Sequence, residues 1–280
     1  MAKDGIFWQG EWIQPGEKEA LAIKRLISVL KQSSSGKTIL ALAANKDPNF
    51  ESLIHIGDSS ITESTYSRTY SLLDGSESFQ LKHKIYLDKR LSLAEAVFDL
   101  SHELTHFSLK EVMNPYGHEF SQAAFIRHGI EGIGGELDAF EYECTVAKEL
   151  EQNFAHFPIH QLCNKYWSRN GFNREEAKMD YYVVGSFKVP KKLLDFFPEI
   201  KKENEVVFVS SYAKMPYPLA FFQEYNDTKI AVCKNNERKL QLISSQGREL
   251  ASKQLEQEAK KLQKHKKVFC QKESTNLIKQ

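Results

Sequence analysis

The sequence predicts an α+β protein, and three observations along its 280 residues carry that prediction. Around residue 100, apolar residues recur in alternating steps of four and three, which is the spacing of a helix packed against a core. Directly before this helix, residues 84–88 have the composition of a short strand. From residue 205 onward, short apolar runs separated by polar turns predict further strands.

The helix near residue 100 has a defined start and a defined apolar face. Ser92 followed three residues later by Glu95 predicts a capping box at its first turn. His102 and His106 lie on the side opposite the apolar stripe, so they face away from the core that the stripe builds. The residues of the stripe are Leu93, Val97, Leu100, Leu104 and Phe107.

A metal-binding motif of the HExxH type lies on this helix, where residues 102–106 are His-Glu-Leu-Thr-His. The separation of four residues places the imidazoles of His102 and His106 on one helix face, where one ion can bind both. Glu103 can then take a proton from a water on that ion as general base. The alternative is two ordinary histidines on a helix face. The helical context favours a metal site, and Zn²⁺ is the predicted cofactor.

A catalytic zinc site needs a third protein ligand. The metzincin extension of HExxH requires Gly at position 109 and His at position 112, but Leu109 and Val112 stand there, which excludes that class. A glycine-rich approach leads instead to Glu136, the predicted third ligand, at the start of a helix expected to run to about residue 151. The other residues that remain open as third ligand are Glu131, Glu141, His118 and His128.

With a glutamate on a second helix some 30 residues after HExxH, the sequence resembles the gluzincin metallopeptidases. Residues 136–139, Glu-Leu-Asp-Ala, are similar to the E-x-[DE]-A stretch whose first glutamate is the zinc ligand in several of those families. The resemblance covers roughly residues 80–150. It implies a zincin-like catalytic region, in which a small sheet accompanies the HExxH helix and a second helix supplies Glu136.

Two supporting roles stay open in this region. Several gluzincins place an aspartate four residues after the ligand glutamate, where it orients a histidine ligand, but Phe140 occupies that position here. Asp99 or Asp138 is the expected substitute. A donor that stabilises the oxyanion is also usual in such sites. The residues considered for it are Tyr142, His156, His160, Tyr181 and Tyr182.

Further elements are predicted before the motif. Residues 18–31 have the pattern of an amphipathic helix, and residues 38–44 and 53–57 that of short strands. Asp74-Gly75 is a predicted hairpin turn. The strand at 84–88 either forms a sheet edge that could bind an extended peptide or lies inside the sheet.

Residues 1–200 are predicted to form the metallopeptidase domain and residues 201–280 a small β-rich region that ends in a polar helix. The boundary is placed at 199–204, a charged stretch after Pro198. The strands predicted in the second region are 206–210, 219–223, 229–233 and 239–243, with turns at Asn226-Asp227 and Asn235-Asn236, and the helix is 247–267.

The composition narrows the partners. A formal net charge of +1 gives no electrostatic attraction for nucleic acid or an anionic membrane. No stretch approaches the ~18 apolar residues of a transmembrane helix, and no apolar signal segment follows Met1, although a mature exported chain would look the same. The cysteines permit either free thiols in a cytoplasmic protein or two disulfides in a periplasmic or secreted one. They are Cys144, Cys163, Cys233 and Cys270.

These observations together predict a zinc-dependent hydrolase, most simply a metallopeptidase that acts on a peptide or protein substrate. Its metal ligands would be His102, His106 and Glu136, and its general base Glu103. Two alternatives stay open: a gluzincin-like regulatory protein that acts on one specific partner, and a non-catalytic zinc-binding scaffold. The intact Glu103 argues against the scaffold, which has no need of a base.

Overall fold

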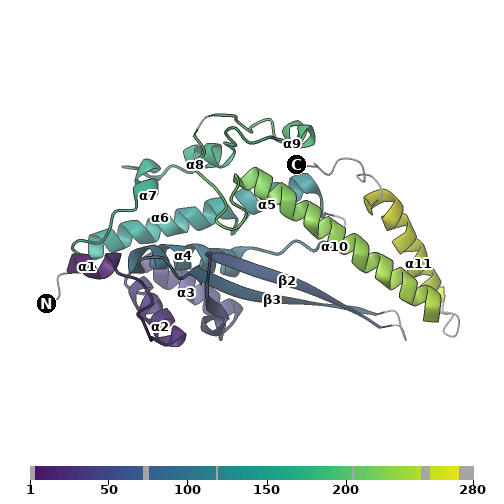
Figure 1. Ribbon diagram of the computed structural model, residues 1–280, viewed down its shortest axis with the longest axis horizontal. Helices are drawn as coiled ribbons and strands as arrows, with labels where there is room; N and C mark the ends of the chain where they lie inside the picture. Colours follow the sequence, from purple (N-terminus) through teal and green to yellow (C-terminus); the bar gives the residue numbers. More distant parts are fainter. Residues whose placement is uncertain (1–3, 72–75, 118, 204, 247–252, 271–280) are drawn as a thin grey trace. The chain divides into compact units, whose positions relative to one another are not determined.

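The computed structural model of the chain (Figure 1) divides into two compact units. It describes residues 4–71, 76–117, 119–203, 205–246 and 253–270. The predicted division of the chain at residue 200 stays a prediction. The first unit comprises Met1–Ser64, His83–Val112 and Gln122–Phe222, and the second comprises Thr65–Lys82, Met113–Ser121 and Gln223–Gln280.

The architecture is α+β, as predicted, and most of the helices belong to the first unit. The helices are α1 (Asp4–Gln9), α2 (Glu19–Leu30), α3 (Ser34–Lys46), η1 (Phe50–Leu53), α4 (Leu93–Leu109), α5 (Gln122–Glu131), α6 (Glu136–Asn153), α7 (Gln161–Lys165), α8 (Arg174–Tyr181), α9 (Lys191–Phe196), α10 (Tyr217–Gln246), α11 (Lys253–His265) and η2 (Lys266–Cys270). The helices predicted at 18–31 and from residue 136 are therefore confirmed as α2 and α6.

A mixed sheet of three strands has the order β1-β3-β2. The strands are β1 (Ile54–Gly57), β2 (Ile61–Tyr70) and β3 (Glu77–Asp88). β1 runs parallel to β3, with Ile54 opposite Ile85 and Gly57 opposite Asp88. The strands predicted at 53–57 and 84–88 are thus confirmed. Because β3 pairs on both sides, the alternative in which it lies inside the sheet is correct, and β2 is an edge instead.

A two-stranded hairpin, β4 (Trp167–Ser168) and β5 (Gly171–Phe172), is also present in the first unit. The turn predicted at Asp74-Gly75 lies outside the described residues.

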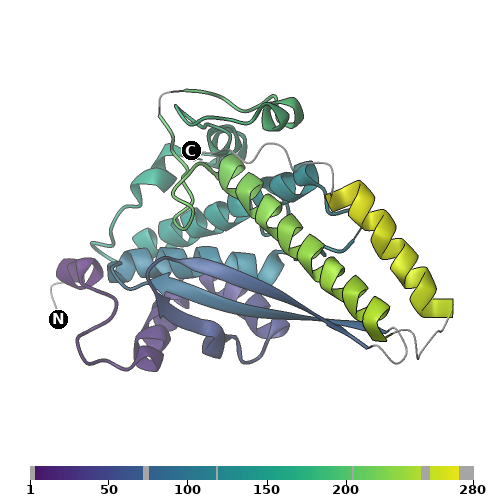
Figure 2. The same cartoon turned by 45° about the vertical axis from the view of Figure 1, so that its right-hand side comes forward.

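Helix α4 starts as its sequence predicts. The Ser92 hydroxyl accepts from the Glu95 N–H, and the Glu95 carboxylate accepts from the Ser92 N–H at 2.8 Å, so the capping box is formed. All five residues of the predicted apolar stripe are buried. α4 packs against α2 and α3 through this stripe and against α6 on its other side (Figures 1 and 2).

Helix α6 takes part in two apolar clusters of the first unit. Leu137, Phe140 and Cys144 belong to a cluster with α5 and α8, whereas Val146 and Leu150 belong to the core around α4. Both ends of the helix are therefore fixed by burial of apolar surface. Since α4 and α6 share one core, the side chains between them are held in a fixed register.

The strand predicted at 38–44 is wrong, because these residues lie in α3. Ser33 caps this helix by accepting from the Gly36 N–H at 2.9 Å. The apolar run that follows is rich in alanine and leucine, which have high helix propensity. A short apolar run alone does not distinguish a buried strand from a helix.

The β-rich C-terminal region is also wrong, since three of its four predicted strands and both predicted turns lie in α10. The segment 206–210 contains only an isolated bridge, between Val209 and Pro216. Buried positions of α10 recur every three or four residues and include the polar Asn236 and Lys239. These two residues interrupt the apolar pattern and divide it into runs that resemble strands. The predicted polar helix is confirmed from Lys253 to His265 as α11, and residues 247–252 lie outside the described part.

In the second unit, α11 lies beside the later part of α10 (Figure 2). Lys239 is buried and bonds to the carboxylates of Glu77 and Glu258. A disulfide joins Cys233 of α10 to Cys270. Among the described helices, none has the length and apolar character needed to cross a membrane.

Candidate metal centre

The packing of α4 on α6 brings three potential metal ligands together, namely His102, His106 and Glu136. Glu136 Oε2 is 3.4 Å from His102 Nε2, and Glu136 Oε1 is 3.4 Å from His106 Nε2. One ligand atom from each residue lies within 4.8 Å of the others. Tetrahedral zinc with ligands at ~2.0–2.1 Å places ligand atoms about 3.3 Å apart. The two distances between imidazole and carboxylate therefore match this value, and the group of three side chains could hold one ion.

The hydrogen bonds of the two imidazoles fix which nitrogen faces the candidate site. His102 Nδ1 is 2.8 Å from Glu143 Oε2, and His106 Nδ1 is 2.8 Å from the carbonyl oxygen of Gly134. A carboxylate and a carbonyl can only accept, so each Nδ1 carries a proton and donates it. In a neutral imidazole, Nε2 then has a free lone pair, which is the form that binds a metal.

These partners correct the expectation that Asp99 or Asp138 would orient a histidine directly. Glu143 is seven residues after Glu136 and so faces the same way two helical turns later, where it reaches His102. Asp138 instead accepts from the Gly134 N–H at 2.9 Å and binds Arg174. It therefore supports the loop whose carbonyl orients His106.

Gly134 adopts a left-handed conformation, with φ of 67°. A Cβ atom at this position would lie 2.3 Å from the backbone nitrogen of Lys110 and 2.7 Å from the carbonyl carbon of Leu109. Both the conformation and the contact exclude a side chain. The glycine thus lets the loop before α6 approach the end of α4 and present its carbonyl to His106.

Two carboxylates, those of Glu136 and Glu143, lie beside the His102 imidazole. Burial by itself lowers the pKa of His102, but hydrogen bonds with Glu136 and Glu143 more than offset it and raise the pKa well above the ordinary value. Burial likewise raises the pKa of Glu136, whereas the charge of His106 and bonds from both histidines leave it well below its usual value. The same carboxylates that stabilise an imidazolium would stabilise a cation bound at Nε2 in place of the proton.

Glu103, the predicted base, follows His102 on α4 and is only 6 % exposed. Its Oε2 is buried and has no hydrogen-bond partner among the described residues. The Thr62 hydroxyl of β2 donates to its backbone carbonyl at 2.9 Å. An unpaired buried carboxylate oxygen costs stability, and a water on a metal ion beside it would satisfy that oxygen.

Asp99 lies one turn before Glu103, and its side chain is half-buried. Burial and the negative charge of Glu143 raise the pKa of Asp99 to about 7, although a hydrogen bond from Ser60 lowers it. Its carboxyl group therefore contributes less negative charge near His102 than its residue type suggests.

A tyrosine that the sequence does not mark lies at this site. The Tyr217 hydroxyl is within hydrogen-bonding reach of the Glu136 carboxylate, and burial together with the charge of Glu136 raises the pKa of Tyr217 well above its ordinary value. Tyr181 is also near, but its hydroxyl donates to the backbone carbonyl of Glu136 at 3.1 Å. Tyr217 begins α10, between two predicted strands, and no motif accompanies it.

The other residues considered as third ligand have different partners. Glu131 bonds to Tyr182 and pairs with Arg127 and Lys178, so its carboxylate is engaged elsewhere. Glu141 pairs with Arg174.

The two histidines considered for that role also lie elsewhere or outside the structure. His128 Nε2 bonds to the carbonyl of Glu111. His118 lies outside the described residues.

Of the five residues considered as oxyanion donors, Tyr181 bonds to Glu136, and His160 reaches only Glu143, the partner of His102. His160 Nε2 is 2.8 Å from Glu143 Oε1. The Tyr182 hydroxyl is bound by Glu131, Tyr142 packs against the core, and His156 is exposed. The sequence analysis therefore missed Tyr217, Glu143 and the Gly134 carbonyl. Of these, only Glu143 could have been found from the sequence, because it lies on the same helix face as Glu136.

Comparison with known proteins does not assign the chain: no protein-family model, curated protein or solved structure matches it.

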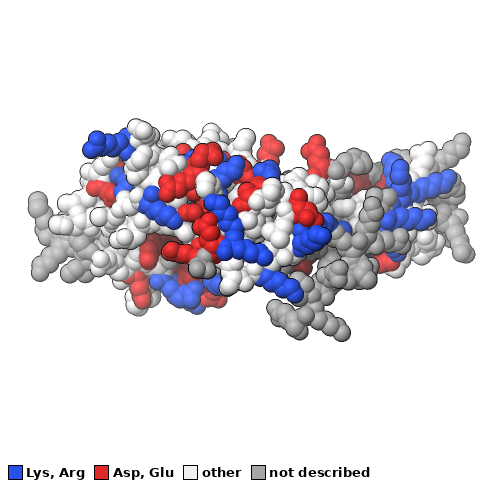
Figure 3. Space-filling model, turned by 90° about the horizontal axis from the view of Figure 1, so that it is seen from above, with Lys and Arg blue, Asp and Glu red and all other residues white. Residues whose placement is uncertain are grey.

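The surface carries charges of both signs. On the face shown in Figure 3, Lys and Arg side chains are interspersed with Asp and Glu side chains. The composition agrees, with 38 basic and 37 acidic residues. The predicted lack of a nucleic-acid partner stays a prediction.

The close approach at Gly134 can be tested by substitution, with Gly16 as the matched control. Gly134→Ala should lower the free energy of unfolding, because the new Cβ collides with backbone of α4, and should weaken metal binding ~10-fold by shifting the His106 acceptor. Gly16→Ala places Cβ in open space at a similarly positive φ, so it should cost only the conformational strain of ~1–2 kcal/mol. Denaturant unfolding and metal titration of both variants measure this. Equal losses in both would contradict the role given to Gly134.

Proposed function

We propose that the protein is a zinc-dependent hydrolase, and specifically a metallopeptidase of the gluzincin type, with His102, His106 and Glu136 as metal ligands. The observation that carries the proposal is the group of two imidazoles and a carboxylate. It is supported by Glu103, the residue after His102, whose buried Oε2 has no hydrogen-bond partner among the described residues. Two histidines and a glutamate are the donor set of a catalytic zinc site that keeps one position open. The arrangement of a small sheet, the HExxH helix α4 and the ligand helix α6 supports the gluzincin assignment.

A bound zinc ion would supply Lewis acidity, which polarises a carbonyl and makes water acidic enough to lose a proton near neutral pH. Glu103 then acts as general base: it takes the proton of the attacking water and returns it to the leaving amine. Burial of Glu103 excludes bulk water from this transfer. Glu143 and the Gly134 carbonyl keep the two imidazoles oriented throughout.

Tyr217 is proposed as the group that stabilises the oxyanion. Burial keeps its hydroxyl protonated, so it can donate to the oxygen that becomes negative when water adds to the peptide carbonyl. Its place beside Glu136 puts the donor next to the metal ligands. Tyr181 is less suited, because its hydroxyl donates to the backbone carbonyl of Glu136, whereas that of Tyr217 lies at the ligand carboxylate itself.

The two alternative functions can be distinguished from a general peptidase by different observations. A scaffold that only binds zinc has no use for an unpaired buried carboxylate oxygen, which costs ~1–3 kcal/mol. A regulatory protein that acts on one specific partner would use the same residues but cleave few peptides. Cleavage of a peptide library therefore separates the general peptidase from the second alternative.

The full chain should bind about one zinc ion, and the binding should depend on Glu136. Elemental analysis and zinc titration are compared for wild type, His102→Ala/His106→Ala, Glu136→Ala and Glu141→Ala. Glu141 is on the same helix and pairs with Arg174, so Glu141→Ala controls for loss of a carboxylate near the site. We expect zinc to be lost in the first two variants and retained in the control. Equal zinc in all four samples would refute the site.

Glu103→Gln should keep the fold and the zinc but reduce cleavage of a fluorescence-quenched peptide library by several orders of magnitude, since an amide cannot accept the proton of water. The replacement has nearly the same shape, so the buried position is preserved. Wild-type rates in this variant would show that Glu103 is not the base. A wild-type protein that binds zinc but cleaves no peptide of the library would favour the regulatory alternative.

Tyr217→Phe separates stabilisation of the oxyanion from support of the ligand Glu136. For an oxyanion donor, kcat falls ~10²–10³-fold while zinc affinity stays unchanged. Tyr181→Phe is the matched control, because it removes a nearby hydroxyl that bonds to a backbone carbonyl. This variant should lower the free energy of unfolding and leave kcat nearly unchanged. If Tyr217→Phe instead weakens zinc binding at unchanged kcat, the tyrosine supports Glu136 and is not the oxyanion donor.

A further inference from the structure

The Glu143 carboxylate serves two histidines at once. Its Oε2 is 2.8 Å from His102 Nδ1, and its Oε1 is 2.8 Å from His160 Nε2. Although burial alone would raise it, these bonds lower the pKa of Glu143 to about 2. With one oxygen held by each imidazole, the carboxylate plane cannot rotate freely, so the place of His160 determines the acceptor that His102 meets.

The chain fixes His160 in one tautomer and one place. Its Nδ1 accepts from the backbone N–H of Cys163 at 3.2 Å, as the cap of α7. Nε2 therefore carries the proton and donates it to Glu143. The His160 N–H in turn donates to Glu151 Oε1 at 3.3 Å, so the backbone of this residue is also tied to α6.

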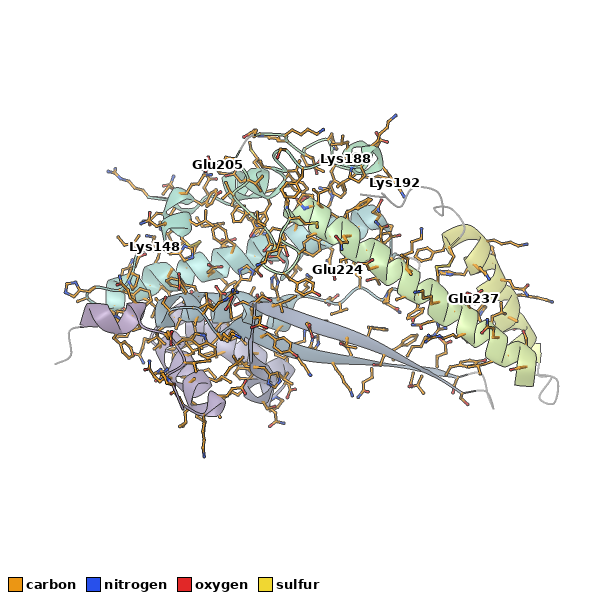
Figure 4. The ribbon with its side chains drawn as sticks, in the orientation of Figure 1. Lys148, Lys188, Lys192, Glu205, Glu224 and Glu237 are labelled. Carbon is orange, nitrogen blue, oxygen red and sulfur yellow. A yellow bond between two sulfur atoms is a disulfide. The ribbon has the colours of Figure 1, made fainter. Side chains whose placement is uncertain are left out.

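The start of α7 is held on α6 by further contacts. Lys148 of α6 (Figure 4) pairs with Glu151 at 2.9 Å and bonds to the side chain of Asn164. A disulfide joins Cys144 to Cys163, and both cysteines are fully buried. Cys144 directly follows Glu143, and Cys163 supplies the N–H that His160 accepts. The disulfide thus links the residue after Glu143 to the residue whose N–H binds His160.

We propose that His160, held by the Cys144–Cys163 disulfide, is a positioning residue for the metal ligand His102 and acts on it through Glu143. It touches neither the metal position nor a reacting atom. Its role is to fix the carboxylate that selects the Nδ1–H form of His102 and directs Nε2 to the metal. The inference rests on the proposed metal site, but its direct object is the orientation of His102.

Zinc affinity of the full chain is the first test, with His160→Ala and His160→Gln as a pair. We expect a ~10-fold weaker affinity for the alanine variant, the lower end of what outer partners of metal ligands contribute, and recovery in the glutamine variant, whose amide can donate to Glu143. His156→Asn, an exposed neighbour with φ of 63° that asparagine tolerates, is the control. Thermal unfolding of each variant shows whether it is folded. Wild-type affinity in a folded His160→Ala variant would overturn the proposal.

A second readout needs no metal, so it separates this proposal from the proposed function. In the metal-free chain, the Nδ1 proton of His102 should give a hydrogen-bonded ¹H–¹⁵N NMR signal that shifts in His160→Ala and returns in His160→Gln. A wild-type chain that shows this signal but binds no zinc would overturn the proposed function and leave the positioning intact. An unchanged signal in His160→Ala would overturn the positioning.

The role of the Cys144–Cys163 disulfide can be tested against the second disulfide as a control. Cys144→Ala/Cys163→Ala should weaken zinc binding several-fold and shift the His102 signal, since α7 loses its covalent link to α6. Cys233→Ala/Cys270→Ala removes the disulfide of the second unit and should change neither. Equal effects of both pairs, or none from the first, would overturn the role assigned to Cys144–Cys163.

Discussion

The candidate site depends on one constraint, the register in which α4 packs against α6. The histidines lie four residues apart on α4, and Glu136 stands on the first turn of α6, so a shift of one residue along either helix would turn a ligand away. Burial of Val97, Leu100 and Leu104 in the core that α4 shares with the end of α6 holds this register. The polar site is thus positioned by apolar packing on its far side.

This arrangement places ionisable side chains in a buried environment, which lowers stability unless they are paired. Buried carboxylates and imidazoles are tolerated only when each is paired or hydrogen-bonded. Glu143 meets this condition fully, because both of its oxygens are bound. Glu103 does not, since its Oε2 has no partner in the described part of the chain. Other buried side-chain atoms also lack a partner among the described residues, Ser108 Oγ of α4 among them. The oxygen of Glu103 differs from these in being a carboxylate oxygen within HExxH, and the proposed role as general base would explain it.

Local signals made much of this predictable. HExxH, the Ser92–Glu95 capping box and the helix from Glu136 depend on spacings within one or two turns, and the structure confirms the helix start and brings the two histidines to Glu136. Glu143 obeys the same helical periodicity as Glu136. Tyr217 could not be found in this way, because its place results from tertiary packing. The strands predicted after residue 205 failed for a related reason: buried Asn236 and Lys239 break the apolar pattern of α10.

The supports of the two histidines differ in kind. His106 relies on the backbone carbonyl of Gly134, whose loop is fixed by its left-handed conformation and by Asp138. His102 relies on a side chain, Glu143, which has rotational freedom that must be removed from outside the site. His160 and a buried disulfide remove it. Disulfides form and persist in oxidising compartments. The proposed orientation of His102 would therefore be fixed only where Cys144 and Cys163 can form their bond. Zinc binding at the site would then depend on the compartment in which the chain folds.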